Sequence, residues 1–258
     1  MTLTEIRAAL ETNGLRPLKS LGQNFLFDQN LCLQIVKALA PTAKSKVIEI
    51  GPGLGALTSL LLDLEIDLCT LEIDRGLSRY LNEKFQHFPN FKLIEGDAVE
   101  TLATAEPCNY LIGNLPYNAS TPIMAALLDQ AALPQRCVFM LQKETGLRYA
   151  AAEHGSDYGA ITVYLQSFYR VQILRSVSPS VFFPAPEIQS VIVQLDLLPE
   201  PILNDPAQRR PFYNFVRQGF SQRRKKLKNL LPVPLEIRAE ELSVTGWQTL
   251  FTQTNIPS

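Results

Sequence analysis

Short apolar runs alternate with amphipathic stretches from the N-terminus to Leu141. The apolar runs predict strands at Lys46–Ile50, Asp67–Glu72, Phe91–Glu95, Tyr110–Ile112 and Arg136–Leu141. The amphipathic stretches predict helices at Leu3–Thr12, Asp28–Ala40, Ala56–Leu64, Asp74–Phe85 and Ser120–Gln130. Because strands that alternate with helices of about ten residues form βαβ units, the pattern predicts a mostly parallel, doubly wound sheet.

The pattern changes after Leu141. Two β-branched stretches separated by a proline-rich loop predict further strands, at Val163–Val177 and Ile188–Leu197. Pro199 and Pro201 indicate a domain boundary. Beyond it, polar segments predict helices at Pro206–Gly219, Gln222–Leu230 and Ser243–Gln253. The predicted fold class is therefore α/β, with a Rossmann-like domain over residues 1–199 and a small all-helical domain over residues 200–258.

The composition restricts the class of protein. A chain of 258 residues that is 46% apolar can bury a substantial core. Its four cysteines are scattered, which predicts neither disulfides nor a metal site and favours a reducing compartment, the cytoplasm. The first residues predict an acidic amphipathic helix instead of a signal peptide, and no apolar run reaches the roughly 18 residues of a membrane span. A monomer is expected, because no additional apolar face stands out.

Charge is distributed unevenly along the chain. The formal net charge is −1, yet the segment from Pro206 to Leu235 carries eight basic residues and no acid, so the remainder carries −9. The eight are Arg209, Arg210, Arg217, Arg223, Arg224, Lys225, Lys226 and Lys228. Such asymmetry indicates a local anion-binding face, although a solvated helix surface gives the same pattern.

A glycine loop and two acids suggest a cofactor site. Gly51 and Gly53 follow the first strand of the alternating region, and without a Cβ their backbone can approach a ligand closely. Glu72 ends the next strand, where it can accept hydrogen bonds from ribose hydroxyls, and Asp97 follows the third, where it can accept one from an adenine amino group. Either acid alone could be a helix N-cap or a solvated strand end. Together, with G-x-G-x-G spacing and no basic residue in the loop, they favour S-adenosylmethionine over NAD.

The segment Gly113-Asn114-Leu115-Pro116-Tyr117 follows the fourth strand. An amine conjugated to an aromatic ring is a weak nucleophile, and hydrogen-bond acceptors can draw its nitrogen toward tetrahedral geometry. The Asn114 side-chain oxygen and the Leu115 carbonyl are candidate acceptors, and Tyr117 is a candidate stacking partner for an adenine. Alone, the segment would also suit an ordinary turn. After the cofactor motif, it predicts methyl transfer to adenine N6 by positioning and electrostatics.

In this order, the motifs resemble those of the family of small-subunit ribosomal RNA adenine dimethyltransferases, over nearly the whole chain. They are Leu21–Leu26, Ile50–Thr58, Leu71–Asp74, Gly96–Ala98, Gly113–Asn118, Met140–Glu144, Phe182–Pro186 and Phe220–Leu227. The family converts two adjacent adenosines near the 3′ end of 16S rRNA to N6,N6-dimethyladenosine. The resemblance therefore implies S-adenosylmethionine as cofactor, 16S rRNA in the small ribosomal subunit as partner, and a role in subunit biogenesis.

The resemblance also implies roles for single residues. Asn24 and Leu26 would cover the cofactor, and Gly51 would approach its methionine moiety. Glu72 would bind its ribose and Asp97 its adenine.

At the methyl-acceptor site, the resemblance would place Asn114 between the cofactor and the base. Phe182 would stack on the target adenine opposite Tyr117. A helical element over Phe215–Leu231 would face the RNA. Contacts with RNA would come from Arg223, Arg224, Lys225 and Lys226, with Gln142, Lys143 and Arg148 near the RNA backbone.

Three alternatives stay open. An antibiotic-resistance methyltransferase that modifies 23S rRNA shares the glycine loop and the tetrad, but Leu21–Leu26 and Gln222–Lys225 resemble the small-subunit enzymes more closely. A DNA adenine methyltransferase has a similar tetrad, yet no separate domain that would read DNA is evident. A ribosome-assembly or transcription factor without catalysis is disfavoured because four residues expected at the site are all present: Glu72, Asp97, Asn114 and Tyr117.

Overall fold

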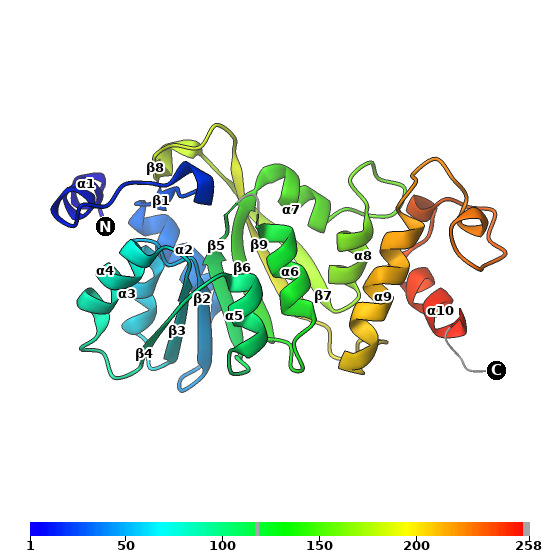
Figure 1. Cartoon of the computed structure of the whole chain (residues 1–258), viewed down its shortest axis with the longest axis horizontal. Coiled ribbons are helices and arrows are strands. Elements are labelled where there is room, and N and C mark those ends of the chain that lie inside the picture. Colours follow the sequence, from blue (N-terminus) through cyan, green and yellow to red (C-terminus); the bar gives the residue numbers. More distant parts are fainter. Residues whose placement is uncertain (117–118, 255–258) are drawn as a thin grey trace.

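A seven-stranded sheet forms the centre of the molecule (Figure 1). The computed structural model describes residues 1–116 and 119–254. The strands, in spatial order, are β4 (Phe91–Glu95), β3 (Asp67–Glu72), β2 (Lys46–Ile50), β5 (Tyr110–Asn114), β6 (Arg136–Gln142), β9 (Ser190–Leu197) and β7 (Tyr169–Val177). Strands β2 to β6 pair in parallel, and β9 is antiparallel to both of its neighbours. The mostly parallel sheet predicted from the sequence is confirmed.

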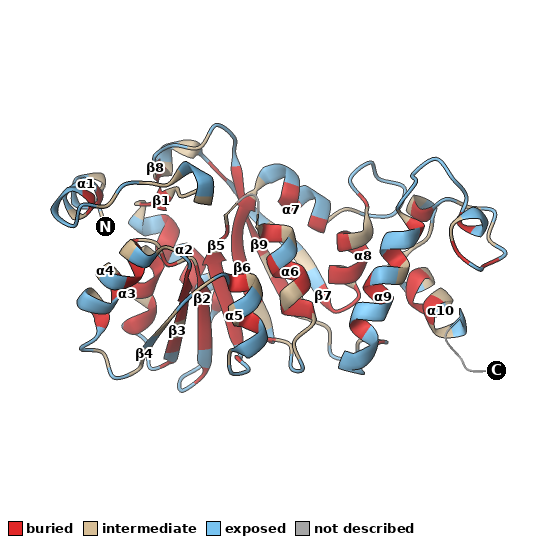
Figure 2. Ribbon diagram, in the orientation of Figure 1, coloured by how far each residue is buried: buried red, intermediate tan, exposed pale blue. Residues whose placement is uncertain are grey.

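Helices cover both faces of this sheet. On one face lie α2 (Gln29–Leu39), α3 (Ala56–Leu62) and α4 (Arg75–Phe85). On the other lie α5 (Ala98–Thr104), α6 (Ser120–Leu128), α7 (Lys143–Tyr149) and α8 (Ala160–Gln166), of which only α6 was predicted as a helix. Because successive side chains of a strand point to opposite faces, β2 contributes Val47 to one hydrophobic cluster and Ile48 to the other. Figure 2 shows the central strands buried along most of their length, which confirms the doubly wound class.

The N-terminal segment lies over the carboxyl ends of the central strands. It comprises α1 (Leu3–Thr12), the 3-10 turn η1 (Lys19–Leu21) and the short strand β1 (Phe25–Leu26). Strand β1 pairs with β8 (Phe182–Phe183), which follows the turn η2 (Pro179–Val181) in the proline-rich loop. Side chains from α1 and β1 form a third cluster with Leu54 of the glycine loop and Leu77 of α4. The sequence did not predict this attachment.

The C-terminal helices pack on α8, beyond the edge strand β7 (Figure 1). They are α9 (Pro206–Gly219) and α10 (Val244–Thr254), joined by a segment with two 3-10 turns, η3 (Leu227–Asn229) and η4 (Ala239–Glu241). Their core is aromatic: Trp247 is fully buried between Phe215 and Phe220, and Tyr213 stacks on Tyr164 of α8 with 4.4 Å between ring centroids. These rings belong to the same hydrophobic cluster as α5 to α7. A domain boundary after residue 199 stays a prediction.

The strand predicted at Val163–Val177 is wrong in its first part. Helix α8 extends to Gln166, and β7 begins only at Tyr169. Every residue from Ile161 to Leu165 is buried. A helix buried on all sides has no polar face, so its apolar run cannot be distinguished from a strand by periodicity.

The helix predicted at Gln222–Leu230 is also wrong, and the element expected over Phe215–Leu231 is α-helical only as far as Gly219. Helix α9 ends at Gly219, and the chain then folds back on itself. The backbone N–H of Leu227 donates to the carbonyl of Ile237 at 2.8 Å instead of to a residue one turn earlier. Hydrogen bonds to the carbonyls of Leu235 and Ile237 replace the helical hydrogen bonds, and no local sequence pattern predicts them.

We expect Gly219→Ala to destabilise the C-terminal helices. A Cβ at Gly219 would lie 2.3 Å from Cη2 of the buried Trp247 ring. Alanine usually stabilises a helix by about 1 kcal/mol relative to glycine, but here overpacking should reverse the sign and cost about 1–3 kcal/mol. Urea unfolding followed by the fluorescence of Trp247, the single tryptophan, measures the change.

Gly159→Ala is the control for that substitution, because its Cβ would meet only the Asp157 carbonyl oxygen, at 4.0 Å. If both variants unfold at the wild-type urea concentration, the close packing of α9 on Trp247 is contradicted.

Candidate active site

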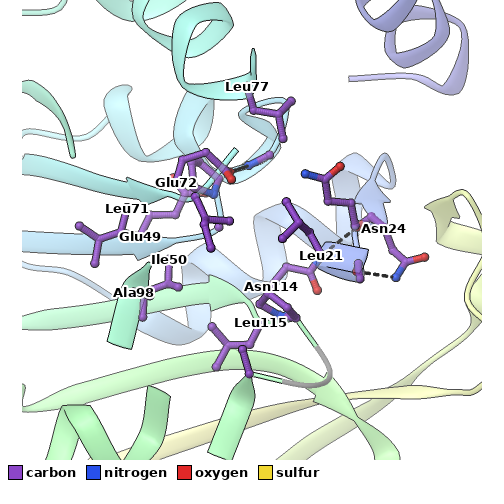
Figure 3. A pocket seen from close by; sticks show the side chains of 18 of the residues that line it. Leu21, Asn24, Glu49, Ile50, Leu71, Glu72, Leu77, Ala98, Asn114 and Leu115 are labelled. Carbon is purple, nitrogen blue, oxygen red and sulfur yellow. Dashed lines mark hydrogen bonds between the residues drawn. The ribbon is translucent and has the colours of Figure 1, made fainter. Parts of the chain in front are cut away.

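A cavity opens at the carboxyl ends of the central strands, beneath the N-terminal segment (Figure 3). Residues predicted from the sequence to bind the cofactor or the amine line it together: Asn24, Leu26, Gly51, Gly53, Glu72, Asp97, Asn114 and Leu115. Parallel strands end at one edge of a sheet, so residues far apart in the chain meet there. The grouping supports a single site, and the role of each residue stays a prediction.

The glycine loop turns sharply at the end of β2. Gly51 and Gly53 have φ angles of 66° and 60°, in the left-handed region where a Cβ causes strain. A Cβ at Gly53 would also lie 3.1 Å from the ring of Phe25, so the loop and the N-terminal segment are in direct contact. The backbone N–H of Gly53 donates to Oε2 of Glu72 at 3.2 Å. The loop is therefore tied both to β1 and to the acid that ends β3.

Glu72 is a buried acid, with an exposed fraction of 4%. Its Oε1 accepts a hydrogen bond from the backbone N–H of Asp74 at 3.0 Å, and its Oε2 accepts the one from Gly53. Burial raises the pKa of Glu72 to about 7, although both hydrogen bonds act to lower it. Such a carboxyl group can accept hydrogen bonds from a ligand that brings hydroxyl groups into the cavity.

Asp97 lies between β4 and α5 and serves as the N-cap of α5. Its Oδ1 accepts a hydrogen bond from the backbone N–H of Val99 at 2.8 Å. The side chain also faces the cavity, and among the described residues none donates to Oδ2. The capping interpretation and the ligand-binding interpretation are therefore compatible, with one oxygen for each.

Glu49 has no predicted role, yet it lines the cavity. It stands in β2 two residues before Gly51, is 1% exposed, and accepts a hydrogen bond from Oγ1 of Thr58 at 2.7 Å. Burial raises its pKa to about 8, and the nearby Glu72 acts in the same direction. The signal in the sequence was an acid within an otherwise apolar strand, because a buried carboxyl group is costly unless something compensates it.

Asn114 ends β5, and the N-terminal segment orients its side chain (Figure 3). Its Nδ2 donates to the backbone carbonyl of Asn24 at 2.9 Å. No described residue donates to its Oδ1, which is left as an acceptor at the cavity wall. Leu115 is held in place by its own N–H, which donates to the carbonyl of Met140 at 3.1 Å. Tyr117, the predicted stacking residue, lies outside the described residues.

Phe182, the other predicted stacking residue, is not on the cavity wall. It lies opposite Leu26 in the β1–β8 pair, is 3% exposed, and belongs to a hydrophobic cluster with Met140 and Val177. In this structure it is a core aromatic, because the β1–β8 pairing covers it. Stacking on adenine would require Phe182 to leave this cluster, and it stays a prediction.

The lining residues suit S-adenosylmethionine. Three of them, Glu49, Glu72 and Asp97, are acidic, and no lysine, arginine or histidine stands among the described residues of the wall. The cofactor carries a sulfonium and an ammonium group against one carboxylate, so its net charge is opposite to that of the wall. Apolar side chains such as Ile73 and Ala98 provide surfaces for an adenine ring. A phosphate-rich dinucleotide would find no cationic side chain among the described residues of the wall.

Comparison with known protein families agrees with this geometry. The model of the family described as "Ribosomal RNA adenine dimethylase" matches residues 15–245. The chain belongs to this family. The predicted enzyme class, an S-adenosylmethionine-dependent rRNA adenine dimethyltransferase, is thereby confirmed together with its cofactor.

Individual relatives and solved structures are similar over most of the chain. A "Ribosomal RNA small subunit methyltransferase A" from Pseudomonas syringae pv. syringae (strain B728a) is 40% identical over 236 residues, 90% of this chain and 87% of the relative. One from Hahella chejuensis (strain KCTC 2396) is 43% identical over 227 residues, 86% and 82% of the two chains. A dimethyladenosine transferase from Plasmodium falciparum, with a TM-score of 0.77 at 24% identity and coverage of 90% and 97%, shares the fold.

The basic run of this dimethylase is not uniformly available to an anion. Arg209 is buried and donates to the carbonyls of Leu128 and Gln130 at the end of α6. Other members of the run form ion pairs: Arg210 with Asp129, Arg223 with Glu240 at 3.8 Å, Lys226 with Glu236 at 2.9 Å, and Lys228 also with Glu236. The partner acids, Asp129, Glu236 and Glu240, lie outside the segment from Pro206 to Leu235, so the charge of that segment alone did not reveal these ion pairs.

Arg224 and Lys225 differ from their neighbours. Both are exposed, and neither makes an ion pair with a residue in the described parts of the chain. Lys143 and Arg148, at the two ends of α7, are also exposed, and Nζ of Lys143 donates to the side chain of Gln189 at 3.2 Å. Of the four cations predicted to contact RNA in the C-terminal part, Arg224 and Lys225 are therefore the two without an ion pair in the described parts of the chain, and RNA binding stays a prediction.

The raised pKa of Glu49 predicts opposite effects of Glu49→Gln on the stability of the fold and on cofactor binding. A carboxyl group whose pKa is raised by folding, from 4.5 to about 8 for Glu49, contributes stability that is present at low pH and lost as the pH rises toward 8. The neutral variant avoids this loss. Relative to wild type, it should gain roughly 4 kcal/mol between pH 5 and pH 8.5 in urea unfolding without cofactor.

The same variant should bind S-adenosylmethionine more weakly at pH 8.5, because a negative charge facing a cationic ligand is removed. Isothermal titration calorimetry measures this affinity. Glu83→Gln on the exposed face of α4 is the matched control and should change neither quantity. A Glu49→Gln variant whose relative stability does not depend on pH would show that the buried carboxyl group is ionised throughout.

Proposed function

We propose that this enzyme dimethylates N6 of two adjacent adenosines near the 3′ end of 16S rRNA in the small ribosomal subunit. The substrate is supported by relatives at about 40% identity that are named for the small subunit. The chemistry is supported above all by Asn114, whose Nδ2 is held by Asn24 while Oδ1 is left to accept from an amine. We further propose that it acts as a monomer in the cytoplasm during subunit biogenesis. Within residues 1–116 and 119–254, no helix is long and apolar enough to cross a membrane.

The residues of the chain bind and orient the amine in this proposal. Oδ1 of Asn114 and the carbonyl of Leu115 accept the two N6 hydrogens, which draws the lone pair out of conjugation and directs it at the methyl group. When bound, S-adenosylmethionine supplies a methyl group on a sulfonium that leaves as a neutral thioether. The methylated nitrogen then loses its proton to water, because neither acceptor is a base. One N–H remains for the second transfer, and one acceptor suffices to hold it.

The substrate is tested with purified enzyme, labelled S-adenosylmethionine and ribosomal subunits from a strain that lacks the modification. We expect label in small-subunit RNA, in dimethyladenosine, and none in large subunits or in duplex DNA. Label in large-subunit RNA alone would overturn the substrate assignment in favour of the resistance-type alternative.

Asn114→Ala tests the acceptor. Removal of one hydrogen-bonding group that acts in the transition state costs about a hundredfold or more in turnover, so the initial rate on small subunits should fall by at least that factor. Binding of the subunit should persist, because the basic face is unchanged. Asn30→Ala, on the exposed start of α2, is the control and should retain full activity. Equal turnover by the two variants would remove Asn114 from the mechanism.

The unpaired cations are tested against the paired ones. Each lost phosphate contact lowers the slope of log affinity against log salt by about 1. Arg224→Gln with Lys225→Gln should therefore lower the slope by about 2. Lys226→Gln with Lys228→Gln removes the same charge but takes it from residues paired with Glu236, and should lower the slope by less than about 1. Filter binding to small subunits at several salt concentrations measures both, and equal slopes would contradict the distinction.

A further inference from the structure

The side chain of Gln23 attaches the N-terminal segment to the start of α4. Its Oε1 accepts a hydrogen bond from the backbone N–H of Leu18 at 2.8 Å, and its Nε2 donates to Oδ2 of Asp74 at 2.9 Å. Asp74 is the N-cap of α4, and its Oδ1 accepts from the N–H groups of Gly76 and Leu77 at 2.8 and 3.2 Å. Both ends of the Gln23 carboxamide are therefore occupied, and its partner belongs to a packed helix.

The residue after this anchor carries the carbonyl that holds Asn114. The side chain of Asn24 donates to the carbonyl of Gly22 at 3.0 Å, which fixes the local turn, and the Asn24 carbonyl accepts from Nδ2 of Asn114 at 2.9 Å. The two ends of the Asn114 carboxamide are nearly equal in size but opposite in hydrogen bonding. Rotated by 180°, Asn114 would present an N–H donor to the amine it must accept from. The position of the Asn24 carbonyl selects the orientation that leaves Oδ1 as an acceptor.

The anchor also adjoins the acid predicted to bind the ribose. The backbone N–H of Asp74 donates to Oε1 of Glu72, and Oε2 of Glu72 accepts from Gly53. Asp74, in the turn after β3, therefore contacts both sides of the cavity. Its backbone N–H orients the carboxyl group of Glu72 on the cofactor side, and its side chain holds Gln23, the residue before Asn24, on the acceptor side.

We propose that Gln23 is a positioning residue for methyl transfer, which acts by placing the Asn24 carbonyl so that Oδ1 of Asn114 points to the target amine. The proposal rests on the proposed function, because it assumes that Asn114 receives the amine. Gln23 itself does not contact the amine. Gln23 is one of the residues that line the cavity, and its loss allows the Asn114 carboxamide to rotate.

An exchange of donor and acceptor tests this. Gln23→Glu places two carboxylates against each other, and Asp74→Asn places two amide nitrogens there. The double variant restores every contact in reverse: Nδ2 at position 74 donates to the carboxylate at position 23, which still accepts from Leu18. Asparagine caps a helix about as well as aspartate does, so α4 is preserved. Gln29→Glu and Asp28→Asn at the start of α2 are matched controls, because Gln29 is exposed and Asp28 is likewise an N-cap.

We expect each single variant to lower kcat on small subunits by about tenfold to a hundredfold at saturating cofactor, with KM for the subunit unchanged. The double variant should return to within about threefold of wild type, since a small misplacement of a reacting group accounts for the whole loss. The controls should retain wild-type kcat. Recovery in the double variant shows that the effect runs through the contact between positions 23 and 74, and a loss of kcat at unchanged KM separates positioning from a loss of folded enzyme. Unchanged kcat in the single variants, or no recovery in the double variant, overturns the proposal.

A second measurement does not depend on the substrate. The side-chain amide signal of Asn114 in a ¹H–¹⁵N spectrum, identified by its absence in Asn114→Ala, should shift in Gln23→Glu and return in the double variant. If small subunits receive no methyl groups but this signal behaves as expected, the proposed function fails while the positioning role stands. If the signal is the same in all variants, the positioning role fails whatever the substrate is.

Discussion

The hydrogen bond from Nδ2 of Asn114 to the carbonyl of Asn24 joins parts of the chain that are 90 residues apart. It holds the N-terminal segment over the end of β5, and it leaves one side of a carboxamide free to act as an acceptor. The contact of Phe25 with Gly53 closes the same segment over the glycine loop. The N-terminal segment thus covers both the cofactor side and the acceptor side of the cavity, so a movement of this segment affects both.

Two of the acids that line the cavity are buried, and burial of a carboxylate costs free energy of folding. Glu49 and Glu72 are almost completely buried, and burial raises the pKa values of both above the ordinary range for glutamate. A cationic cofactor supplies the charge that the wall lacks, and its binding should therefore stabilise the fold as well as prepare the reaction. Binding of S-adenosylmethionine is therefore expected to stabilise the part of the sheet that carries Glu49 and Glu72, in β2 and β3.

In the C-terminal part, tertiary contacts leave only some of the basic side chains available to an anion. Of the eight cations between Pro206 and Leu235, Arg209 is used to bind carbonyl groups at the end of α6, and several others are paired with acids. Arg217 on α9 is exposed and lies over the ring of Tyr213, while Arg224 and Lys225 leave exposed charge on the loop that follows α9. An RNA contact from a loop beside the buried Trp247 would be placed by the aromatic core beneath it.

The sequence by itself determined the α/β class and the place of the cofactor. Each amphipathic helix and buried strand leaves a local periodicity, and residues that follow parallel strands, such as Glu72 and Asp97, must meet at one edge. Tertiary structure alone decided which residues are covered and which are paired. It buried α8 on all sides and so removed its helical signal, covered Phe182 with β1, and placed the Asn24 carbonyl against Asn114. These outcomes depend on contacts between distant segments, and no local pattern of residues encodes them.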